Sequence, residues 1–405
     1  MSLPASLLGA LPMCRLLAGI LVCLFAFSAV ATADELPKFK KIQLSNNYYS
    51  EGASYGDFNQ DGKLDLVSGP FWFEGPDFKT KHKFYEGKQY PNDRGYSDNF
   101  FSFVGDFNGD GWDDVLVGGL PGTPAHWYQN PQGEGEWKKH LAFPVVDNEA
   151  PLFADITGDG NRELIFHYEG RLGYARSNHE SPDEPWLFTA ISEKGPWQRY
   201  THGLGIGDVN GNGRMDFLMP TGWWEHPESG GDEKAVWKQQ AARFCPGGAT
   251  IHATDLNGDG KHDIVTSLRG HGYGLVWHEQ QGDADEVKFT EHLIMGEKPE
   301  ENEFRVAFSQ LHAVEMADID GDGIQDIITG KCYWAHNGND PGARDPAVVY
   351  VFLTRRDGEK VSFQPVQVDD DSGTGRQVTI ADMNGDGKLD IMAGNKKGIF
   401  LFVQE

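Results

Sequence analysis

The chain has 405 residues and a formal net charge of −26 at pH 7, and 51 of its residues are glycine. So acidic a surface should repel nucleic acid, and no basic stretch interrupts it, which excludes a nucleic-acid partner. No low-complexity tract or Pro/Ser-rich linker divides the sequence, so one large domain is expected after the N-terminal leader.

The N-terminal residues predict export. Arg15 precedes an apolar run over residues 16–30, and Ala31, Thr32 and Ala33 form a small-x-small cleavage sequence. The run is short for a membrane span. We therefore expect a signal peptide over residues 1–33, a mature domain over residues 34–405, a periplasmic or secreted location, and no stable membrane span after cleavage.

A strand of alternating polarity, residues 39–44, follows the leader, and an acidic phrase then begins to repeat. The phrase D-x-N-x-D-G-x-x-D occurs seven times at intervals of 47 to 64 residues, and each copy runs into a short apolar strand, as at residues 64–68. An outer strand completes the unit, as at residues 137–141 and 289–293. A period of this size indicates an array of units that bury their apolar faces against one another.

Each repeated loop offers the oxygen ligands that calcium requires. Positions 1, 3, 5 and 9 supply side-chain oxygens, position 7 supplies a carbonyl, and glycine at position 6 permits the sharp turn. The loops are not EF-hands, because position 12 lacks the bidentate Glu and no helical pattern flanks them. Thr157, Glu163 and Asn212 depart from the consensus, so the third and fourth sites are expected to be weaker or empty. The predicted ligands of up to seven structural Ca²⁺ ions are Asp57, Asn59, Asp61, Asp65, Asp106, Asn108, Asp110, Asp114, Asp155, Thr157, Asp159, Glu163, Asp208, Asn210, Asn212, Asp216, Asp255, Asn257, Asp259, Asp263, Asp318, Asp320, Asp322, Asp326, Asp382, Asn384, Asp386 and Asp390.

This pattern resembles the FG-GAP or VCBS-type repeats of integrin-like β-propellers, from about Lys38 to the C-terminus. The resemblance implies an all-β, seven-bladed β-propeller with calcium in the loop between the first and second strands of each four-stranded blade. After the seventh loop only two more strands fit. Residues 39–44 should therefore supply the missing outer strand and close the ring, which removes exposed sheet edges.

Function is expected at the opposite end of the blades, where long connections gather round one central mouth. The positions six residues before each loop, and the connections between second and third strands, bring histidines, acids, arginine and aromatics to this end. That composition is typical of a metal or acid/base site, so a transition metal at the mouth is a further expected cofactor. His252 and Glu315 lie deeper in their strands and are expected to be hydrogen-bonded core groups. The candidate catalytic residues are His202, His312, His271 and Tyr273, and the candidate ligand-binding residues are Glu51, Glu149, Arg171, Trp223, Arg269, Lys331, His336 and Arg376.

Two classes of function are open. The first is a non-catalytic module that binds an extracellular carbohydrate or protein, with Trp223 placed to stack on a sugar. The second is a carbohydrate lyase or dehydratase, because the blade sequences also resemble, more weakly, the propeller domain of aldos-2-ulose dehydratases; the cupin domains that accompany that propeller do not occur in this sequence. In a lyase, His202 and His312 with a metal would acidify a proton beside a carbonyl, and Tyr273 or His271 would remove it.

Cys245 and Cys332 could form a disulfide or remain two free thiols.

Overall fold

The computed structural model describes residues 35–405 except 134, 229–235, 283–285 and 359, so the predicted signal peptide over residues 1–33 lies outside the described residues. From Leu36 onward the chain forms one compact unit. Within the described ranges, no helix has the length and apolarity that a membrane crossing requires.

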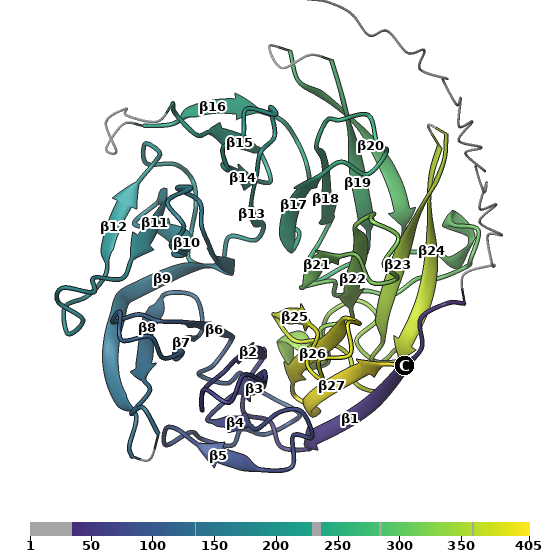
Figure 1. The fold of residues 1–405 in the computed structure, drawn as a ribbon. Helices are drawn as coiled ribbons and strands as arrows, with labels where there is room; N and C mark the ends of the chain where they lie inside the picture. Colours follow the sequence, from purple (N-terminus) through teal and green to yellow (C-terminus); the bar gives the residue numbers. More distant parts are fainter. Residues whose placement is uncertain (1–34, 134, 229–235, 283–285, 359) are drawn as a thin grey trace, which may run out of the picture. The chain divides into compact units, whose positions relative to one another are not determined.

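This unit is all-β, as predicted, and the helical elements among its described residues are two short 3-10 turns, η1 (Pro299–Glu301) and η2 (Ala335–Gly338). The strands form sheets curled round a central channel (Figure 1). In the order of hydrogen bonding, one sheet contains β2 (Ser54–Gly56), β3 (Asp65–Ser68), β4 (Phe71–Phe73) and β5 (Lys81–Lys83). The next contains β6 (Phe101–Gly105), β7 (Asp114–Gly118), β8 (Thr123–Gln129), β9 (Lys138–Ala154), β10 (Glu163–Tyr168), β11 (Arg171–Arg176) and β12 (Leu187–Ala190). A third contains β16 (Lys238–Ala241), β15 (Gly222–Glu225), β14 (Asp216–Met219), β13 (Leu204–Gly207), β17 (Thr250–Thr254), β18 (Asp263–Ser267), β19 (Leu275–Gln281) and β20 (Lys288–Met295). The last two contain β21 (Val314–Ala317), β22 (Asp326–Gly330), β23 (Val349–Asp357) and β24 (Lys360–Asp369), and β25 (Val378–Ala381), β26 (Asp390–Asn395), β27 (Gly398–Gln404) and β1 (Phe39–Ser45).

Two strands join parts of the chain that the repeat pattern keeps separate. β9 pairs with β8 through its first half and with β10 through its second half, so the outer strand expected at residues 137–141 continues into the next unit without a turn. β1 pairs antiparallel with β27, from Phe39 opposite Gln404 to Ser45 opposite Ile399. The N-terminal strand thus lies in the C-terminal sheet (Figure 1).

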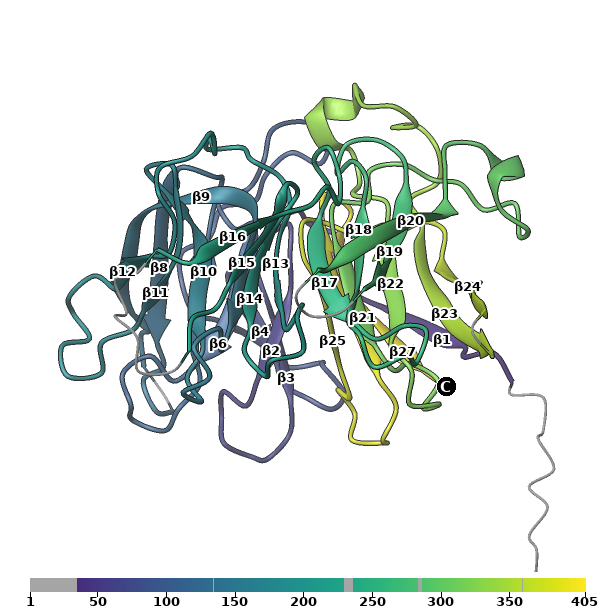
Figure 2. The ribbon, with the colours of Figure 1, turned by 90° about the horizontal axis from the view of Figure 1, so that it is seen from above.

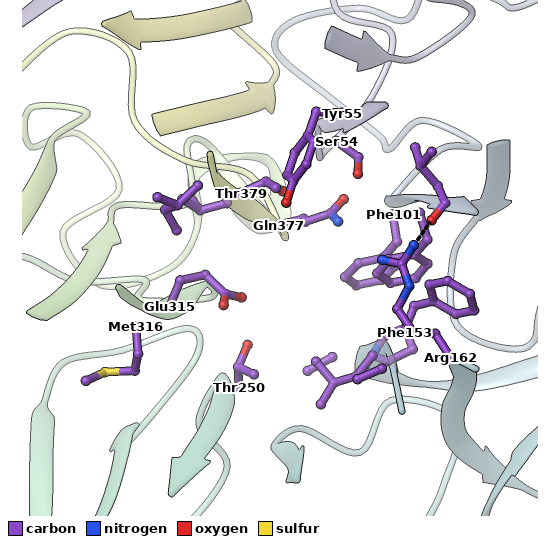
Figure 3. A pocket seen from close by; sticks show the side chains of 18 of the residues that line it. Ser54, Tyr55, Phe101, Phe153, Arg162, Thr250, Glu315, Met316, Gln377 and Thr379 are labelled. Carbon is purple, nitrogen blue, oxygen red and sulfur yellow. Dashed lines mark hydrogen bonds between the residues drawn. The ribbon is translucent and has the colours of Figure 1, made fainter. Parts of the chain in front are cut away.

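The innermost strands surround a cavity of about 550 Å³, which we call the channel. Figure 3 shows the side chains of Thr250, Glu315 and Gln377 directed into it. The residues that these strands contribute to its wall include Tyr55 of β2, Phe103 of β6, Leu152 of β9, Ile206 of β13, His252 of β17, Glu315 of β21 and Thr379 of β25.

Neighbouring repeat units pack through apolar side chains and are also joined by buried amides. Phe58, Val67 and Trp72 of the first unit lie in one cluster with Val104 and Val115 of the second. At the end of the third strand of a later unit, Gln280 Nε2 donates hydrogen bonds to the carbonyls of Val209 at 2.7 Å and His262 at 2.8 Å. Because Val209 belongs to the preceding unit, the amide holds two units together, and we call this contact an amide clasp. The equivalent clasps are Asn130 to the Phe58 carbonyl and Gln404 to the Ile319 carbonyl.

Long connections meet at one end of the channel, which we call the mouth. In Figure 2 the turn η2 (yellow-green) lies at this end, and the acidic loop before β26 (yellow) lies at the other. The backbone N–H of His336 donates to the Tyr96 hydroxyl at 2.9 Å, and Trp334 Nε1 donates to the Asp93 carbonyl at 3.0 Å. These bonds tie the connection before β6 to the connection before β23.

Cys245 and Cys332 are buried free thiols. Of the two alternatives that the sequence leaves open, the structure shows the reduced one.

Candidate functional site

Each acidic loop closes on itself through its first carboxylate. Asp57 accepts hydrogen bonds from the backbone N–H groups of Asp61 at 3.0 Å and Gly62 at 2.9 Å. In all the repeated loops the position-1 Asp accepts this bond from the position-6 glycine, at 2.7–3.0 Å. These glycines have φ between +81° and +90°, and an added Cβ would meet nothing within 4 Å. Glycine is therefore needed for its backbone conformation and not for space.

The closing acid at position 9 has a structural role that sequence analysis did not foresee. Asp114 is fully buried, and its two carboxylate oxygens accept backbone N–H bonds from Phe107 at 3.0 Å and Asn130 at 2.8 Å. Burial raises the pKa of Asp114 to about 8, although both N–H bonds lower it. The carboxylate thus fastens the start of its loop to the end of the third strand, and Asp65, Asp216, Asp263, Asp326 and Asp390 make the same pair of bonds.

Arginine side chains enter two of the loops. In the third loop, Arg176 Nε lies 3.0 Å from Glu163 Oε1 and its Nη2 lies 3.4 Å from Asp159. In the sixth loop, Arg355 lies 2.5 Å from Asp320 and 3.0 Å from Asp322. The guanidinium groups pair with the carboxylates that a calcium ion would use. Both arginines come from the third strand of the unit, β11 and β23, so the loop sequence alone gave no sign of them.

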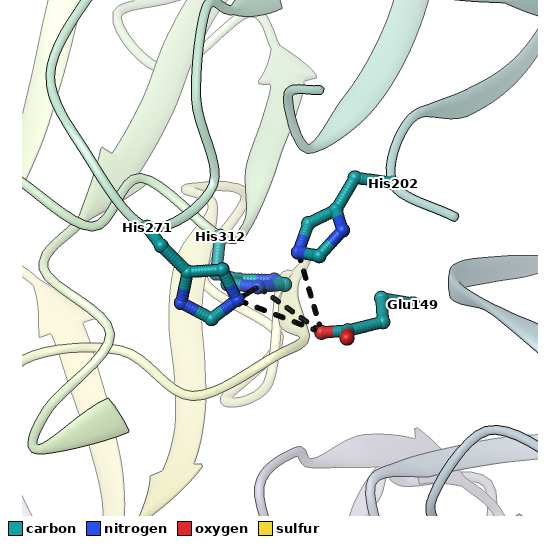
Figure 4. Close-up of side chains that lie close together, drawn as sticks. All are labelled: Glu149, His202, His271 and His312. Carbon is teal, nitrogen blue, oxygen red and sulfur yellow. Dashed lines mark hydrogen bonds and ion pairs between the residues drawn. The ribbon is translucent and has the colours of Figure 1, made fainter. Parts of the chain in front are cut away.

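Four side chains with metal-binding atoms converge at the mouth (Figure 4). They are Glu149 in β9, His202 before β13, His271 between β18 and β19, and His312 before β21. One ligand atom of each lies within 4.8 Å of every other. Glu149 Oε2 lies 3.4 Å from His202 Nε2, 3.4 Å from His312 Nε2 and 3.9 Å from His271 Nε2, and the last two nitrogens are 3.2 Å apart.

Backbone contacts hold these four residues together. The N–H of Glu149 donates to the Thr201 carbonyl at 3.1 Å, which fixes Glu149 beside the residue before His202. The N–H of Gln310 donates to the Gly272 carbonyl at 2.6 Å, which fixes the connection of His271 beside His312. A Cβ on Gly270 would lie 3.0 Å from His202 and 3.2 Å from His312, so a methyl group there would press on both rings and displace them by a few tenths of an ångström.

Hydrogen bonds on the outer ring nitrogens direct the Nε2 atoms inward. His202 Nδ1 lies 2.9 Å from the Tyr200 carbonyl, which only accepts, so Nδ1 carries the proton. His271 Nδ1 lies 3.1 Å from Asp340 Oδ2, a carboxylate that fixes the tautomer in the same way. Burial lowers the pKa of His202, His271 and His312, and the charge of Arg376 lowers each further. All three rings are therefore neutral near pH 7, the form that binds metals.

These residues fit a divalent transition metal. His202 Nε2, which faces the cluster, is buried and has no hydrogen-bond partner among the described residues. Spacings of 3.2–3.9 Å between ligand atoms suit donors that each lie about 2.1 Å from one ion. Against this, Arg376 Nη1 donates to Glu149 Oε2 at 2.9 Å and contacts His312 Nε2, so a positive charge already lies on two of the four donors.

The other candidate residues lie outside this cluster. Glu51 contacts the Tyr48 hydroxyl and lies 3.8 Å from Lys396, and Arg171 pairs with Glu193 at 3.5 Å. Lys331 is buried and donates to the Gly342 and Asp345 carbonyls, which holds the connection after η2 in place. Arg269 is exposed and Tyr273 is half-buried, with its hydroxyl beside Gly342. His336 lies next to the cluster, 4.2 Å from His271 between ring centroids.

Two expectations need correction. Trp223 is 3% exposed and packs against Leu218 and Phe244 in the core, so it presents no face on which a sugar could stack. Glu315 was expected to be a hydrogen-bonded core group, but its side chain is 29% exposed to the channel, with His252 Nε2 at 3.8 Å. His252 does donate, to the Val314 carbonyl at 2.7 Å. Asp340 was not among the predicted site residues. Its position four residues after His336 was the one sign of a carboxylate beside that imidazole.

The family model for FG-GAP-like repeats matches residues 106–166, 255–329 and 318–393. Among solved structures, a lectin from Agrocybe aegerita that recognises non-reducing terminal N-acetylglucosamine is 16% identical, with 89% of this chain and 87% of that chain covered and a TM-score of 0.49. The rhamnogalacturonan lyase YesW is 15% identical, with 90% and 72% covered and a TM-score of 0.44. No curated protein matches the chain. Likenesses at this level do not transfer either protein's activity to this chain.

Proposed function

FG-GAP-like repeats recur along this chain, and from that premise we propose an exported, calcium-stabilised β-propeller of seven blades. Its mouth binds a divalent transition metal and acts on carbohydrate as a lyase or dehydratase. The observation that carries the proposal is the convergence of Glu149, His202, His271 and His312 on one point. The weak resemblance of the blades to the propeller of aldos-2-ulose dehydratases supports the substrate class.

Arg176 and Arg355 each pair with two carboxylates of the third and sixth loops and compete there with a calcium ion, although the acids of both loops still lie within reach of one ion. We therefore assign calcium first to the other five loops. Ions that bind only the folded loops stabilise the fold by mass action. Excess chelator should therefore lower the melting temperature, added Ca²⁺ should restore it, and elemental analysis should find about five calcium ions per chain. A melting curve that chelator leaves unchanged would contradict this part of the proposal.

Glu149, His202, His271 and His312 would hold the transition metal, which when bound polarises a substrate carbonyl or hydroxyl oxygen. His202 and His271 keep 17% and 22% of their side chains exposed, so substrate reaches the cluster from their side. Arg376 is 2% exposed and lies beneath the cluster, where it fixes Glu149 and does not meet substrate.

His336 is the base that this arrangement offers. It is 53% exposed at the mouth, and its Nδ1 lies 3.0 Å from Asp340 Oδ1. Because Asp340 accepts the Nδ1 proton, Nε2 keeps its lone pair and can take a proton from the carbon beside a carbonyl. The electrons of that C–H bond then form a C=C bond while the C–O bond at the next carbon breaks. The leaving oxygen keeps the electron pair of the C–O bond and takes a proton from water. Asp340 thus serves His271 and His336 together.

A non-catalytic carbohydrate-binding mouth is the second candidate, and the contacts of Arg376 favour it. The guanidinium satisfies Glu149 and lies on His312 Nε2 without any ion. In that case the imidazole and carboxylate groups would bind sugar hydroxyls directly. The Arg376→Gln variant distinguishes the two candidate functions. Because the arginine repels a divalent cation, its removal should strengthen metal binding if the mouth holds a metal.

Elemental analysis and ultraviolet absorbance of purified protein test the proposal. The wild type should hold one transition metal per chain and should generate conjugated-carbonyl absorbance from uronate or ketosugar substrates. His202→Ala should lose the metal and Gly270→Ala should bind it more weakly, because the added methyl group presses on two of the ligand rings. Gly118→Ala should keep it, because its added methyl group meets nothing closer than 3.9 Å. His336→Gln should keep the metal and lose the absorbance. Calcium alone, with glycan binding and no absorbance, would establish the binding module instead.

A further inference from the structure

A second cavity, of about 330 Å³, lies beside the mouth between the connection after β5 and the strand β8. We call it the tyrosine pocket. Its volume is near the lower limit for small-molecule sites, which suits one sugar ring better than an oligosaccharide. The side chains that define it are Tyr85, Tyr90, Tyr96, Asp98, His126, Tyr128 and Lys139.

The wall of the tyrosine pocket combines aromatic rings with hydrogen-bonding groups. Tyr85 and Tyr90 are half-buried and provide apolar surface of the kind on which the C–H groups of a pyranose pack. Tyr128 is buried and supports Tyr85 from behind, with the two stacked ring centroids 4.7 Å apart. Asp98 is exposed, and its charge, after burial, raises the pKa of Tyr90. The carboxylate can accept hydrogen bonds from two neighbouring sugar hydroxyls.

The charges at the pocket decide between a sugar and a cation. Four tyrosines with one carboxylate also describe an aromatic cage for a quaternary ammonium group. However, Lys139 lines the same cavity, with its ammonium 5.9 Å from the ring centroid of Tyr128. This positive charge repels a cationic ligand and can donate to a sugar hydroxyl.

Tyr96 connects the tyrosine pocket to the metal cluster. Its ring lines the pocket, and its hydroxyl lies 2.9 Å from the backbone nitrogen of His336 and 3.4 Å from Arg376 Nη2. Arg376 in turn bonds to Glu149. The side chain of Tyr96 thus lies between the tyrosine pocket and the mouth residues His336 and Arg376.

We propose that the tyrosine pocket binds a neutral pyranose ring of the same carbohydrate whose neighbouring unit lies at the mouth, an inference that rests on the function proposed for the mouth. A substrate of at least two sugar units follows. The pocket contributes affinity and register, and the mouth carries out the reaction.

Nuclear magnetic resonance of protein with ¹³C-labelled tyrosine tests this. Cellobiose, lactose and maltose serve as probes. At least one should shift tyrosine signals, and Tyr90→Ala and Asp98→Asn should each weaken its binding about fivefold or more. Tyr350→Ala, a half-buried tyrosine of β23 outside the pocket, is the matched control and should leave binding unchanged. If Tyr90→Ala does not fold, Asp98→Asn at its exposed position decides the question.

The outcomes separate this inference from the proposed function. Tyrosine variants that lose saccharide binding but keep the transition metal support the pocket. A wild type that holds the metal but shows no tyrosine shift with any of the three disaccharides overturns the pocket and leaves the mouth standing. Shifts with choline in place of the sugars overturn it as well. If the wild type holds no transition metal but the shifts occur and Asp98→Asn removes them, the mouth proposal fails and the pocket stands as a saccharide site.

Discussion

The amide clasp of Gln280 allows a quantitative test of how repeat units are held together. Gln280 is 6% exposed, and its Nε2 donates to two carbonyls, one of them in the preceding unit. Gln280→Leu keeps the size of the side chain and the backbone bond to Asp263 but removes both clasp bonds. The Val209 and His262 carbonyls then lose their side-chain donor in a place from which water is largely excluded.

The expected cost follows from these two bonds. Each net hydrogen bond contributes about 1 kcal/mol, and a buried acceptor left without a partner costs about 1–3 kcal/mol. The added apolar contact of leucine offsets part of this, so we expect a loss of about 2–4 kcal/mol in the free energy of unfolding. In a chain of this size that corresponds to a fall of roughly 3–6 °C in melting temperature.

Calorimetry and urea unfolding measure this loss, each in saturating calcium and in excess chelator. The control is Gln281→Leu, the next residue along β19, which is exposed and should change stability by no more than about 0.5 kcal/mol. The loss at Gln280 should persist in chelator, because the clasp contains no ion ligand. If Gln280→Leu and its control unfold alike in both conditions, the clasps do not hold the units together.

Two further predictions concern the N-terminal strand and the channel. Deleting residues 39–45 removes the partner of β27 and leaves an unpaired sheet edge, so the truncated protein should aggregate or lose cooperative unfolding; a monomer that melts like the full chain would refute the role of β1. Burial raises the pKa of Glu315 from 4.5 to about 8, so the folded state keeps a proton that the unfolded state has lost, and stability should decrease as pH rises between these values. A shift of this size would change the free energy of unfolding by ~5 kcal/mol in full, but solvent screens a side chain that is 29% exposed. In urea unfolding we therefore expect the stability of Glu315→Gln to rise by ~2 kcal/mol relative to wild type between pH 5 and pH 9. Parallel pH profiles of the two proteins would contradict this.

The repeat period explains which parts of the site could be predicted. Glu149, His202, His312 and Arg376 all stand six residues before an acidic loop, and that shared offset places them at or just before equivalent inner strands. The structure brings all four into contact or near contact at the mouth. A residue at a fixed position of the repeat can be placed from the sequence, because equivalent positions of successive units lie at the same level along the channel.

Residues outside the repeat register could not be placed in this way. Asp340 and Tyr96 belong to long connections that differ from unit to unit, and their contacts with His271 and Arg376 join segments far apart in the chain. Arg176 and Arg355 reach the acidic loops from other strands, which only the folded unit reveals. Trp223 failed as a sugar-stacking candidate because its neighbours along the chain say nothing about which face of the sheet is covered.

The continuous strand β9 has a consequence for the order in which the molecule assembles. Since its 17 residues belong to two units, those units share one continuous strand and should exchange their amide protons as a single cooperative block. Glu149 lies within this block, whereas His202 and His271 belong to the eight-stranded sheet that contains β13 to β20, and His312 precedes β21 in the next sheet. The carboxylate and the imidazoles would therefore meet only when these separate sheets dock, so the site is completed late in folding.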